Sequence, residues 1–153
     1  MFAQRSSGWI AAPPSHSPMF ECLILGDSTG LGTARAINAT HSVHCDVMAI
    51  EGATTSRVVG WRMAPKRYGT TILAVGSNDR PTPGLKHHLV RLRKKLVTRR
   101  VIWLLPYARE NAGIVNSVAI SFNDESLDLV RFPSRDKLHP SRYSDVAKAL
   151  LKQ

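Results

Sequence analysis

The sequence predicts an α/β fold built on a parallel sheet with helices on both faces. Five short apolar runs recur along the chain, and each is followed by a stretch with helical periodicity, which is the alternation typical of parallel α/β proteins. The runs at 72–75 and 101–105 are apolar at consecutive positions, as expected of central strands that helices cover on both sides. We therefore expect a doubly wound sheet with strand order 2-1-3-4-5, in which ligands bind at the carboxyl ends of the strands.

The strands are placed by the limits of the apolar runs. Trp103 lies inside the fourth run, so we expect its side chain in the core. The five predicted strands are Cys22–Gly26, Cys45–Ile50, Thr71–Val75, Val101–Leu105 and Leu127–Phe132.

The helices are placed by apolar residues that recur three or four positions apart. The clearest, Pro83–Arg100, carries an apolar stripe of leucines at 85, 89, 92 and 96, and its other face is almost entirely basic. Ser141 would cap the last helix. The other expected helices are about Gly30–Asn38 with Leu31, Ala34 and Ile37 buried, Thr55–Met63 with Val58, Val59 and Trp61, Arg109–Phe122 with Ile114, Val118 and Phe122, and Ser141–Leu151 with Tyr143, Val146, Ala147 and Leu150.

The chain has the length of one domain, since 153 residues with 43% apolar content can form a single core without metals or disulfides. We place this domain at 21–153 and expect residues 1–20, with three prolines among serines, to form a loosely ordered arm. The arm lacks the continuous apolar core of a secretory signal, so a cytoplasmic location is the default. Export through a host-specific signal, or a true start at Met19, stays open as an alternative.

The sequence predicts no metal and no organic cofactor. Cys22 and Cys45 lie in no CxxC or comparable ligand spacing, so we expect neither a metal site nor a disulfide framework, and interpret both as buried thiols. The adjacent His87 and His88 would point to different parts of a helix surface and would not share a metal ion. Arg35 stands where a GxGxxG dinucleotide motif would need its third glycine.

The formal charge of +10 raises the local concentration of polyanions at low salt. Nucleic acid, an anionic cell-wall polymer and acidic lipid would all be attracted, and solubility is an equally good explanation of the charge. The basic face of the predicted helix 83–100 lacks the interleaved aromatic residues of a nucleic-acid site. Charge alone therefore identifies no partner.

Polar residues with the chemistry of a serine nucleophile follow the predicted strands. Ser28 comes directly after the first strand, and Asp136 and His139 lie in the loop before the last helix. A serine hydroxyl needs an imidazole to take its proton, and the imidazole needs a carboxylate to fix its tautomer. We therefore expect Ser28 as nucleophile, His139 as base and then acid, and Asp136 as the group that orients His139.

A tetrahedral intermediate also needs hydrogen-bond donors that face its oxyanion. The backbone N–H groups of Ser28 and Gly52 and the side-chain amide of Asn78 are the expected donors. Glycine at 52 permits close approach of the backbone to a ligand, and the amide at 78 donates without bringing a charge. All three follow predicted strands, so they should gather at the same edge of the sheet.

Four blocks of the sequence resemble the SGNH hydrolases, also called GDSL esterases and lipases. They are Gly26-Asp27-Ser28, Gly52, Gly76-Ser77-Asn78-Asp79 and Asp136-Lys137-Leu138-His139-Pro140, in the order and spacing of that family, from about Leu23 to the end of the chain. The resemblance implies a flavodoxin-like three-layer α/β/α fold, ester hydrolysis through an acyl-enzyme, no cofactor, and the roles given above.

Some residues near these blocks depart from the family or have a second interpretation. Thr29 stands where the family often has leucine, which affects packing behind the nucleophile, and the short chain implies an open, shallow site. We interpret Asp27 and Asp79 as supports that bond their own loops. Tyr107 and Arg109 follow the fourth strand at its carboxyl end and are our candidates for contact with substrate.

These observations predict a serine esterase acting on carboxylic esters. An open site and a basic surface would suit removal of acetyl groups from an anionic carbohydrate such as a cell-wall or capsular polymer, and a soluble lipid or small ester is the competing substrate. The alternative from another class is a non-catalytic module that binds polyanions on the same fold. The intact set of Ser28, Asn78, Asp136 and His139 argues against that alternative, because a binding protein needs no base. The oligomeric state is left open.

Overall fold

The computed structural model describes residues 21–40, 43–63 and 65–152, and the arm expected at 1–20 lies outside these ranges. The described chain forms a five-stranded sheet in the order β2-β1-β3-β4-β5, as predicted, and every neighbouring pair is parallel. The strands are β1 (Cys22–Gly26), β2 (Cys45–Ala49), β3 (Tyr68–Ala74), β4 (Thr98–Leu105) and β5 (Glu125–Asp128).

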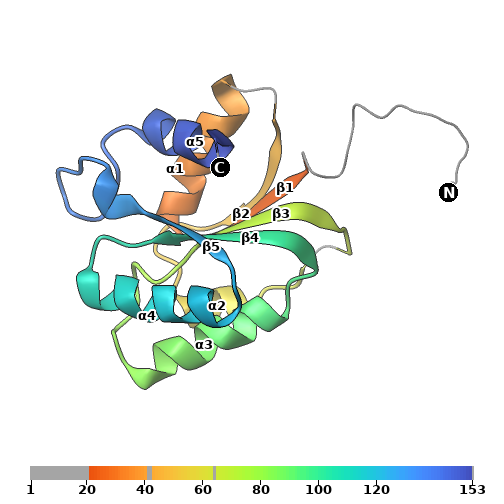
Figure 1. The fold of residues 1–153 in the computed structure, drawn as a ribbon, viewed down its shortest axis with the longest axis vertical. Helices are drawn as coiled ribbons and strands as arrows, with labels where there is room; N and C mark the ends of the chain where they lie inside the picture. The colour runs from red at the N-terminus through yellow and green to blue at the C-terminus, as the bar shows by residue number, and fades with distance from the viewer. Residues whose placement is uncertain (1–20, 41–42, 64, 153) are drawn as a thin grey trace, which may run out of the picture.

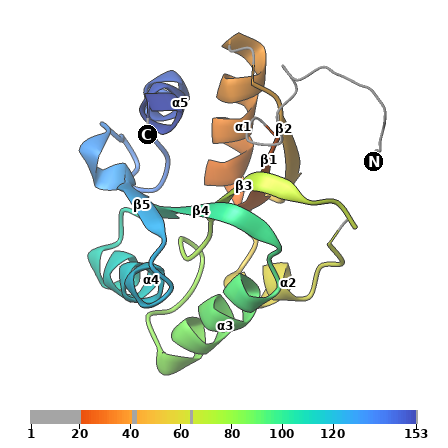
Figure 2. The same cartoon turned by 45° about the vertical axis from the view of Figure 1, so that its right-hand side comes forward.

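Helices cover both faces of the sheet, which gives three layers (Figures 1 and 2). Helices α1 (Ser28–Thr40) and α5 (Tyr143–Lys152) lie side by side on one face. The other face carries α2 (Thr55–Val59), α3 (Pro83–Lys94) and α4 (Arg109–Ser121). Among the described residues, no helix has the length and apolar character needed to cross a membrane.

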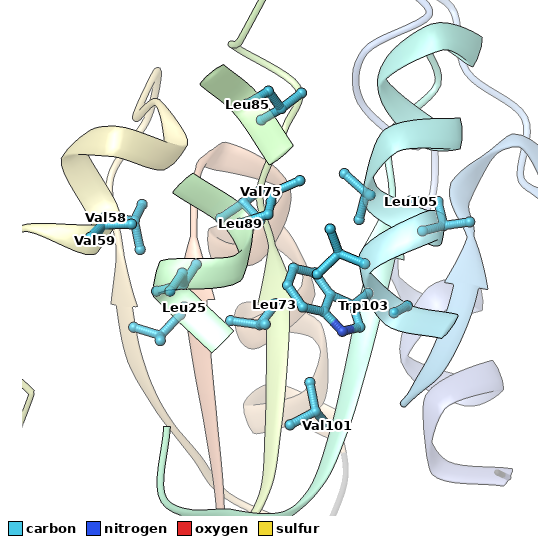
Figure 3. Packing of buried hydrophobic residues seen from close by; sticks show 14 of the residues in the cluster. Leu25, Val58, Val59, Leu73, Val75, Leu85, Leu89, Val101, Trp103 and Leu105 are labelled. Atoms are coloured by element: carbon cyan, nitrogen blue, oxygen red, sulfur yellow. The ribbon is translucent and has the colours of Figure 1, made fainter. Parts of the chain in front are cut away.

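The strands bury alternate residues on opposite faces, so the core has two halves. In β1, Leu23 and Leu25 pack toward α2, α3 and α4, while Ile24 packs toward α1 and α5. Figure 3 shows the first half, where Trp103 lies among leucines and valines from the sheet and its covering helices. Trp103 is fully buried, as predicted, and its indole N–H donates to Asp124 at 2.9 Å.

The helix predicted at 83–100 ends earlier, at Lys94, and its last three residues begin β4. Thr98 and Arg100 pair with Tyr68 and Thr70 of β3, so sheet pairing takes these residues from the helix. Helix α2 also ends earlier than predicted, at Val59, where Gly60 caps it. The fifth strand runs from Glu125 to Asp128 and then turns into a 3₁₀ helix, η3 (Leu129–Arg131), so the prediction of a strand to 132 was wrong.

The core-facing stripe of α4 differs from the predicted one. Ile114 and Phe122 are only partly buried, while Val118 is fully buried as expected. The stripe is rotated because a polar residue, Asn111, takes the first buried position on the helix. The buried residues of α4 are Asn111, Ala112, Val115, Val118 and Ala119.

Several cations of the predicted basic helix face have structural partners. Arg93 forms two hydrogen bonds with the buried Asp124, at 2.7 and 2.9 Å. Lys95 donates to the carbonyls of Val59 and Trp61, and Arg100 pairs with Glu125. Further exposed cations on this side of the molecule are Lys86, Arg91, Lys94 and Arg99.

Cys22 and Cys45 are joined in a disulfide, so the prediction of two thiols was wrong. The two residues begin neighbouring parallel strands and are direct register partners, which brings their Cα atoms to 4.6 Å. That separation lies in the range that a disulfide spans. Both residues are buried, as expected.

Candidate active site

Ser28 is the first residue of α1 and follows β1 after a sharp turn. Gly26 has φ of 147°, and a Cβ there would lie 1.9 Å from the carbonyl oxygen of Ala74, so only glycine fits this position. The next residue, Asp27, caps α1, because its Oδ1 accepts hydrogen bonds from the N–H of Thr29 at 2.9 Å and from its hydroxyl at 2.6 Å. The turn and the cap fix where α1 begins, and with it Ser28.

The structure brings Ser28, His139 and Asp136 together in one chain of hydrogen bonds. The hydroxyl oxygen of Ser28 lies 2.8 Å from Nε2 of His139, across 111 residues of sequence. Nδ1 of the same ring lies 2.7 Å from Oδ2 of Asp136. Ser28 and His139 are partly buried and Asp136 is exposed, so the hydroxyl can be reached from solvent. We call this arrangement the serine–histidine–aspartate chain.

Asp136 is held by its own loop. Its Oδ1 accepts the N–H groups of Leu138 at 2.9 Å and His139 at 2.8 Å, so the carboxylate is fixed relative to the ring that it contacts. The hydrogen bond from the His139 ring, followed by those from the two N–H groups, lowers the pKa of Asp136 below its usual value. The carboxylate is therefore ionised at neutral pH and accepts the Nδ1–H hydrogen.

The two ends of the loop that carries Asp136 and His139 are joined by a hydrogen bond. The N–H of Ser141 donates to the carbonyl of Pro133 at 2.8 Å. Inside the loop, the N–H of Lys137 donates to the hydroxyl oxygen of Ser134 at 2.9 Å, and Lys137 itself has φ of 61°. The left-handed residue turns the chain so that Asp136 and His139 face each other across three positions.

Asn78 lies in the loop after β3, beside the base of the nucleophile turn. Its amide nitrogen donates to the carbonyl of Ala53 at 3.1 Å and approaches Oδ2 of Asp27 at 3.5 Å. The loop is fixed from α4, because the buried Asn111 donates to the carbonyls of Gly76 at 2.7 Å and Asp79 at 2.8 Å. These bonds connect the loop of Asn78 both to the loop after β2 and to the residue before Ser28.

Gly52 lies in the turn that follows β2. The turn is anchored beside the nucleophile, because the N–H of Ile50 donates to the carbonyl of Gly26 at 3.0 Å. Gly52 has φ of 78°, which favours glycine, and a Cβ there would meet no atom within 4 Å. The structure therefore places Gly52 on an open turn at the same edge of the sheet as Ser28 and Asn78.

The two aspartates beside these residues are structural in different ways. Asp27 bonds its own loop, as expected, and is fully buried, which raises its pKa. Asp79 bonds a distant segment, since its carboxylate accepts the N–H of Thr55 at 3.1 Å and the hydroxyl of Thr55 at 2.7 Å. Asp79 thereby fastens the start of α2 to the loop of Asn78.

Tyr107 and Arg109 both have structural partners. The hydroxyl of Tyr107 donates to the carbonyl of Phe132 at 3.0 Å. The guanidinium of Arg109 forms two hydrogen bonds of 2.9 Å with Asp128 and one of 2.7 Å with the carbonyl of Pro106. Tyr107 thus bonds the segment after η3, and Arg109 joins the ends of β4 and β5. Their contact with substrate stays a prediction.

Four supporting residues were missed by sequence reasoning: Thr55, Asn111, Ser134 and Tyr143. Asn111 had a usable signal, because an asparagine on the buried stripe of a helix requires a hydrogen-bond partner. Thr55 and Ser134 had no such signal, since their partners are set by how loops meet in space. Tyr143, whose ring lies against Gly32 of α1, was expected only as a core residue.

The fold is similar to those of solved esterases. An aryl esterase of M. smegmatis superposes with a TM-score of 0.63 at 14% identity, over 87% of this chain and 97% of that one. AlinE4, an SGNH-hydrolase family esterase, gives 0.51 at 16% identity, over 70% and 74% of the two chains. A two-domain esterase active on acetylated mannans gives 0.62 at 16% identity, over 90% of this chain and 50% of that one.

The chain therefore has the three-layer fold of these SGNH-hydrolase esterases, which confirms the fold that the motif resemblance implied. No protein-family model and no curated protein sequence matches it. The likeness at 13–16% identity concerns the fold, and the chemistry rests on the residues at the carboxyl edge of the sheet.

Proposed function

We propose that this protein is a serine esterase that hydrolyses carboxylic esters through an acyl-enzyme. The observation that carries the proposal is the serine–histidine–aspartate chain, in which a contact of 2.8 Å joins Ser28 to His139 across 111 residues and one of 2.7 Å joins His139 to Asp136 in the same loop. Nε2 of His139 is within reach of the hydroxyl proton, and Asp136 is placed to stabilise the imidazolium that forms. A module that only bound a ligand would need none of these contacts.

In the first half of the reaction, the hydroxyl oxygen of Ser28 attacks the ester carbonyl while His139 takes its proton. The oxyanion would accept hydrogen bonds from the N–H groups of Ser28 and Gly52 and from the amide of Asn78. Each donor of this kind contributes about 3 kcal/mol to the stability of the transition state. His139 then gives its proton to the leaving alcohol, and the acyl group stays on Ser28.

In the second half, His139 takes a proton from water, which attacks the acyl-enzyme and releases the acid. The exposure of Asp136 and the partial exposure of Ser28 and His139 let water reach the acyl group without a conformational change. The hydrogen bonds that hold Asp136 keep the ring in place through both halves, so the same His139 can serve twice.

The charges of the site favour an anionic substrate. Arg135 and Lys137 flank Asp136 in the sequence, and Arg80 follows the loop of Asn78; all three are exposed and form no ion pair with another described residue. Cations on the rim would attract an acidic polymer by long-range electrostatics. One structural neighbour is a two-domain esterase active on acetylated mannans, which supports an acetylated carbohydrate as substrate. We infer an acetylated anionic carbohydrate as the substrate class, with small esters as minimal substrates.

The disulfide bears on where the enzyme acts. Disulfides persist in oxidising compartments and are rare in the cytosol. The bond between Cys22 and Cys45 therefore favours the exported alternative over the cytoplasmic default.

The test is hydrolysis of p-nitrophenyl acetate, longer p-nitrophenyl esters and acetylated acidic and neutral polysaccharides. We expect wild-type protein to hydrolyse short esters, and Ser28→Ala to lose about 10⁴-fold or more in kcat. Ser117→Ala is the matched control, because Ser117 is exposed on α4 and bonds only the carbonyl of Ile114. Full activity of Ser28→Ala, or an inactive wild type, would overturn the proposal.

A further inference from the structure

Gly32 lies one helical turn after Ser28 on the same face of α1, and its backbone does not require glycine. The position is inside a helix and has no positive φ, so glycine there makes the helix less stable than alanine would. The reason for glycine at 32 therefore lies in what packs against the helix at this position.

The tip of the Tyr143 ring fills that space. A Cβ added at Gly32 would lie 2.3 Å from Cζ of Tyr143 and 2.4 and 2.6 Å from its two Cε atoms. No side chain can share this volume with the ring, so any residue larger than glycine must displace Tyr143. Gly113 provides a contrast, since a Cβ there, also inside a helix, meets nothing within 4 Å.

Tyr143 is the first residue of α5 and follows His139 by four positions. Helices α1 and α5 pack side by side on one face of the sheet (Figure 2). The ring lies against Gly32, so it stands between the helix that begins with Ser28 and the segment that contains His139. Burial, followed by the nearby charges of Asp27 and Asp136, raises the pKa of the Tyr143 hydroxyl to about 12.

The hydroxyl itself has no hydrogen-bond partner in the described part of the chain. The contribution of Tyr143 must then come from the shape of its ring, because no bond of its oxygen holds either helix. The rest of α5 packs in the core through Val146, Ala147 and Leu150. Among these residues, Tyr143 at the start of the helix is nearest to His139 in sequence.

From this we propose that Tyr143 is a positioning residue, and that its ring, seated on Gly32, sets the distance between Ser28 and His139. The inference rests on the proposed function and deepens it. Displacing the ring would move the start of α5 away from α1 and lengthen the contact of 2.8 Å between the Ser28 hydroxyl and Nε2 of His139. A misplacement of about 1 Å in such a pair can lower kcat about 100-fold.

The experiment compares kcat and KM for a short p-nitrophenyl ester, with melting temperature measured alongside. Gly32→Ala should lower kcat about 10- to 100-fold and change KM little, because the substrate groups of the site stay in place. Gly113→Ala is the matched control and should keep wild-type kcat. In the Gly32→Ala background, Tyr143→Leu removes the ring tip and should recover most of the lost kcat, a non-additivity that independent sites would not show.

Rescue at position 143 separates positioning from general stability. Tyr143→Ala should lower kcat, and Tyr143→Phe, which keeps the ring and loses only the unpartnered hydroxyl, should restore it. Wild-type kcat in Gly32→Ala, or no recovery in the double variant, would overturn the inference while the proposed function stood. A wild type that hydrolyses no ester would instead overturn the proposed function, and this inference with it.

Discussion

Asp136 shows how a single exposed carboxylate can be held in place by local bonds. Its two oxygens accept from the ring of His139, from the N–H groups of Leu138 and His139, and from the hydroxyl of Ser134. All of these partners come from the same short loop, so the geometry of the acid and the imidazole does not depend on the rest of the fold. The motif Asp-x-x-His could be interpreted from the sequence for this reason.

We expect the hydrogen bonds of Asp136 to make the stability of the folded protein depend on pH. The folded pKa of Asp136 is lower than its unfolded value near 3.8, so its bonds stabilise the fold above that value and lose their effect as pH falls through the folded pKa. The urea midpoint of wild type should exceed that of Asp136→Asn at pH 6, and the difference should shrink steadily as the pH falls below the unfolded value near 3.8. A difference that stays constant or widens between pH 4 and pH 2 would contradict this account.

At the scale of elements, the loop after β3 depends on bonds from distant segments. Asn111 on α4 is more than 30 residues away in sequence and donates to two carbonyls of the loop. Asp79, in the loop, accepts the hydroxyl of Thr55 at the start of α2. Two helices, α4 and α2, thus hold the segment that carries Asn78, and the proposed oxyanion donor is positioned by residues outside the serine–histidine–aspartate chain.

Asn111→Ala should therefore affect both stability and catalysis. It leaves the carbonyls of Gly76 and Asp79 without their donor, which costs about 1–3 kcal/mol when such groups are buried. With Asn78 less well held, kcat should fall by about 10-fold or more. Asn116→Ala on the same helix is the control, since Asn116 makes only a 3.4 Å contact with Ser126. Equal effects of the two substitutions on unfolding and kcat would refute the role given to Asn111.

Features set by residues close together in the sequence could be predicted, and contacts between distant segments could not. Strand order, both core faces and the places of Ser28, Asn78, Asp136 and His139 follow from local runs and short motifs, and the structure agrees on where these residues lie. The disulfide, the Asp79–Thr55 bonds and the Arg93–Asp124 pair depend on strand register and on which loops meet. Periodicity carries no information on those, so Cys22 and Cys45 were interpreted as thiols.

At the scale of the molecule, the disulfide joins two strands whose other connection is a helix and a loop. Cys22 and Cys45 are 23 residues apart, so their bond restricts the unfolded chain across α1. A loop of this size contributes about 3 kcal/mol to the free energy of unfolding.

Purified protein should accordingly show no free thiol when it is unfolded without reductant, and two after reduction. The Cys22→Ala, Cys45→Ala double variant should unfold about 3 kcal/mol more easily in urea than oxidised wild type. Its kcat should stay close to wild type, because both cysteines lie at the amino ends of their strands, opposite the candidate site. Two reactive thiols before reduction would show that the bond does not form.

The central claim is that Ser28 is a nucleophile activated by His139. The most direct measurement is reaction with a serine-directed phosphonate, followed by mass spectrometry of the digested protein to locate the modified residue. We predict stoichiometric modification of Ser28 alone, slowed by about 10³-fold or more in His139→Asn, which removes the base. Modification of a different residue, or labelling of Ser28 at the same rate with and without His139, would contradict the claim.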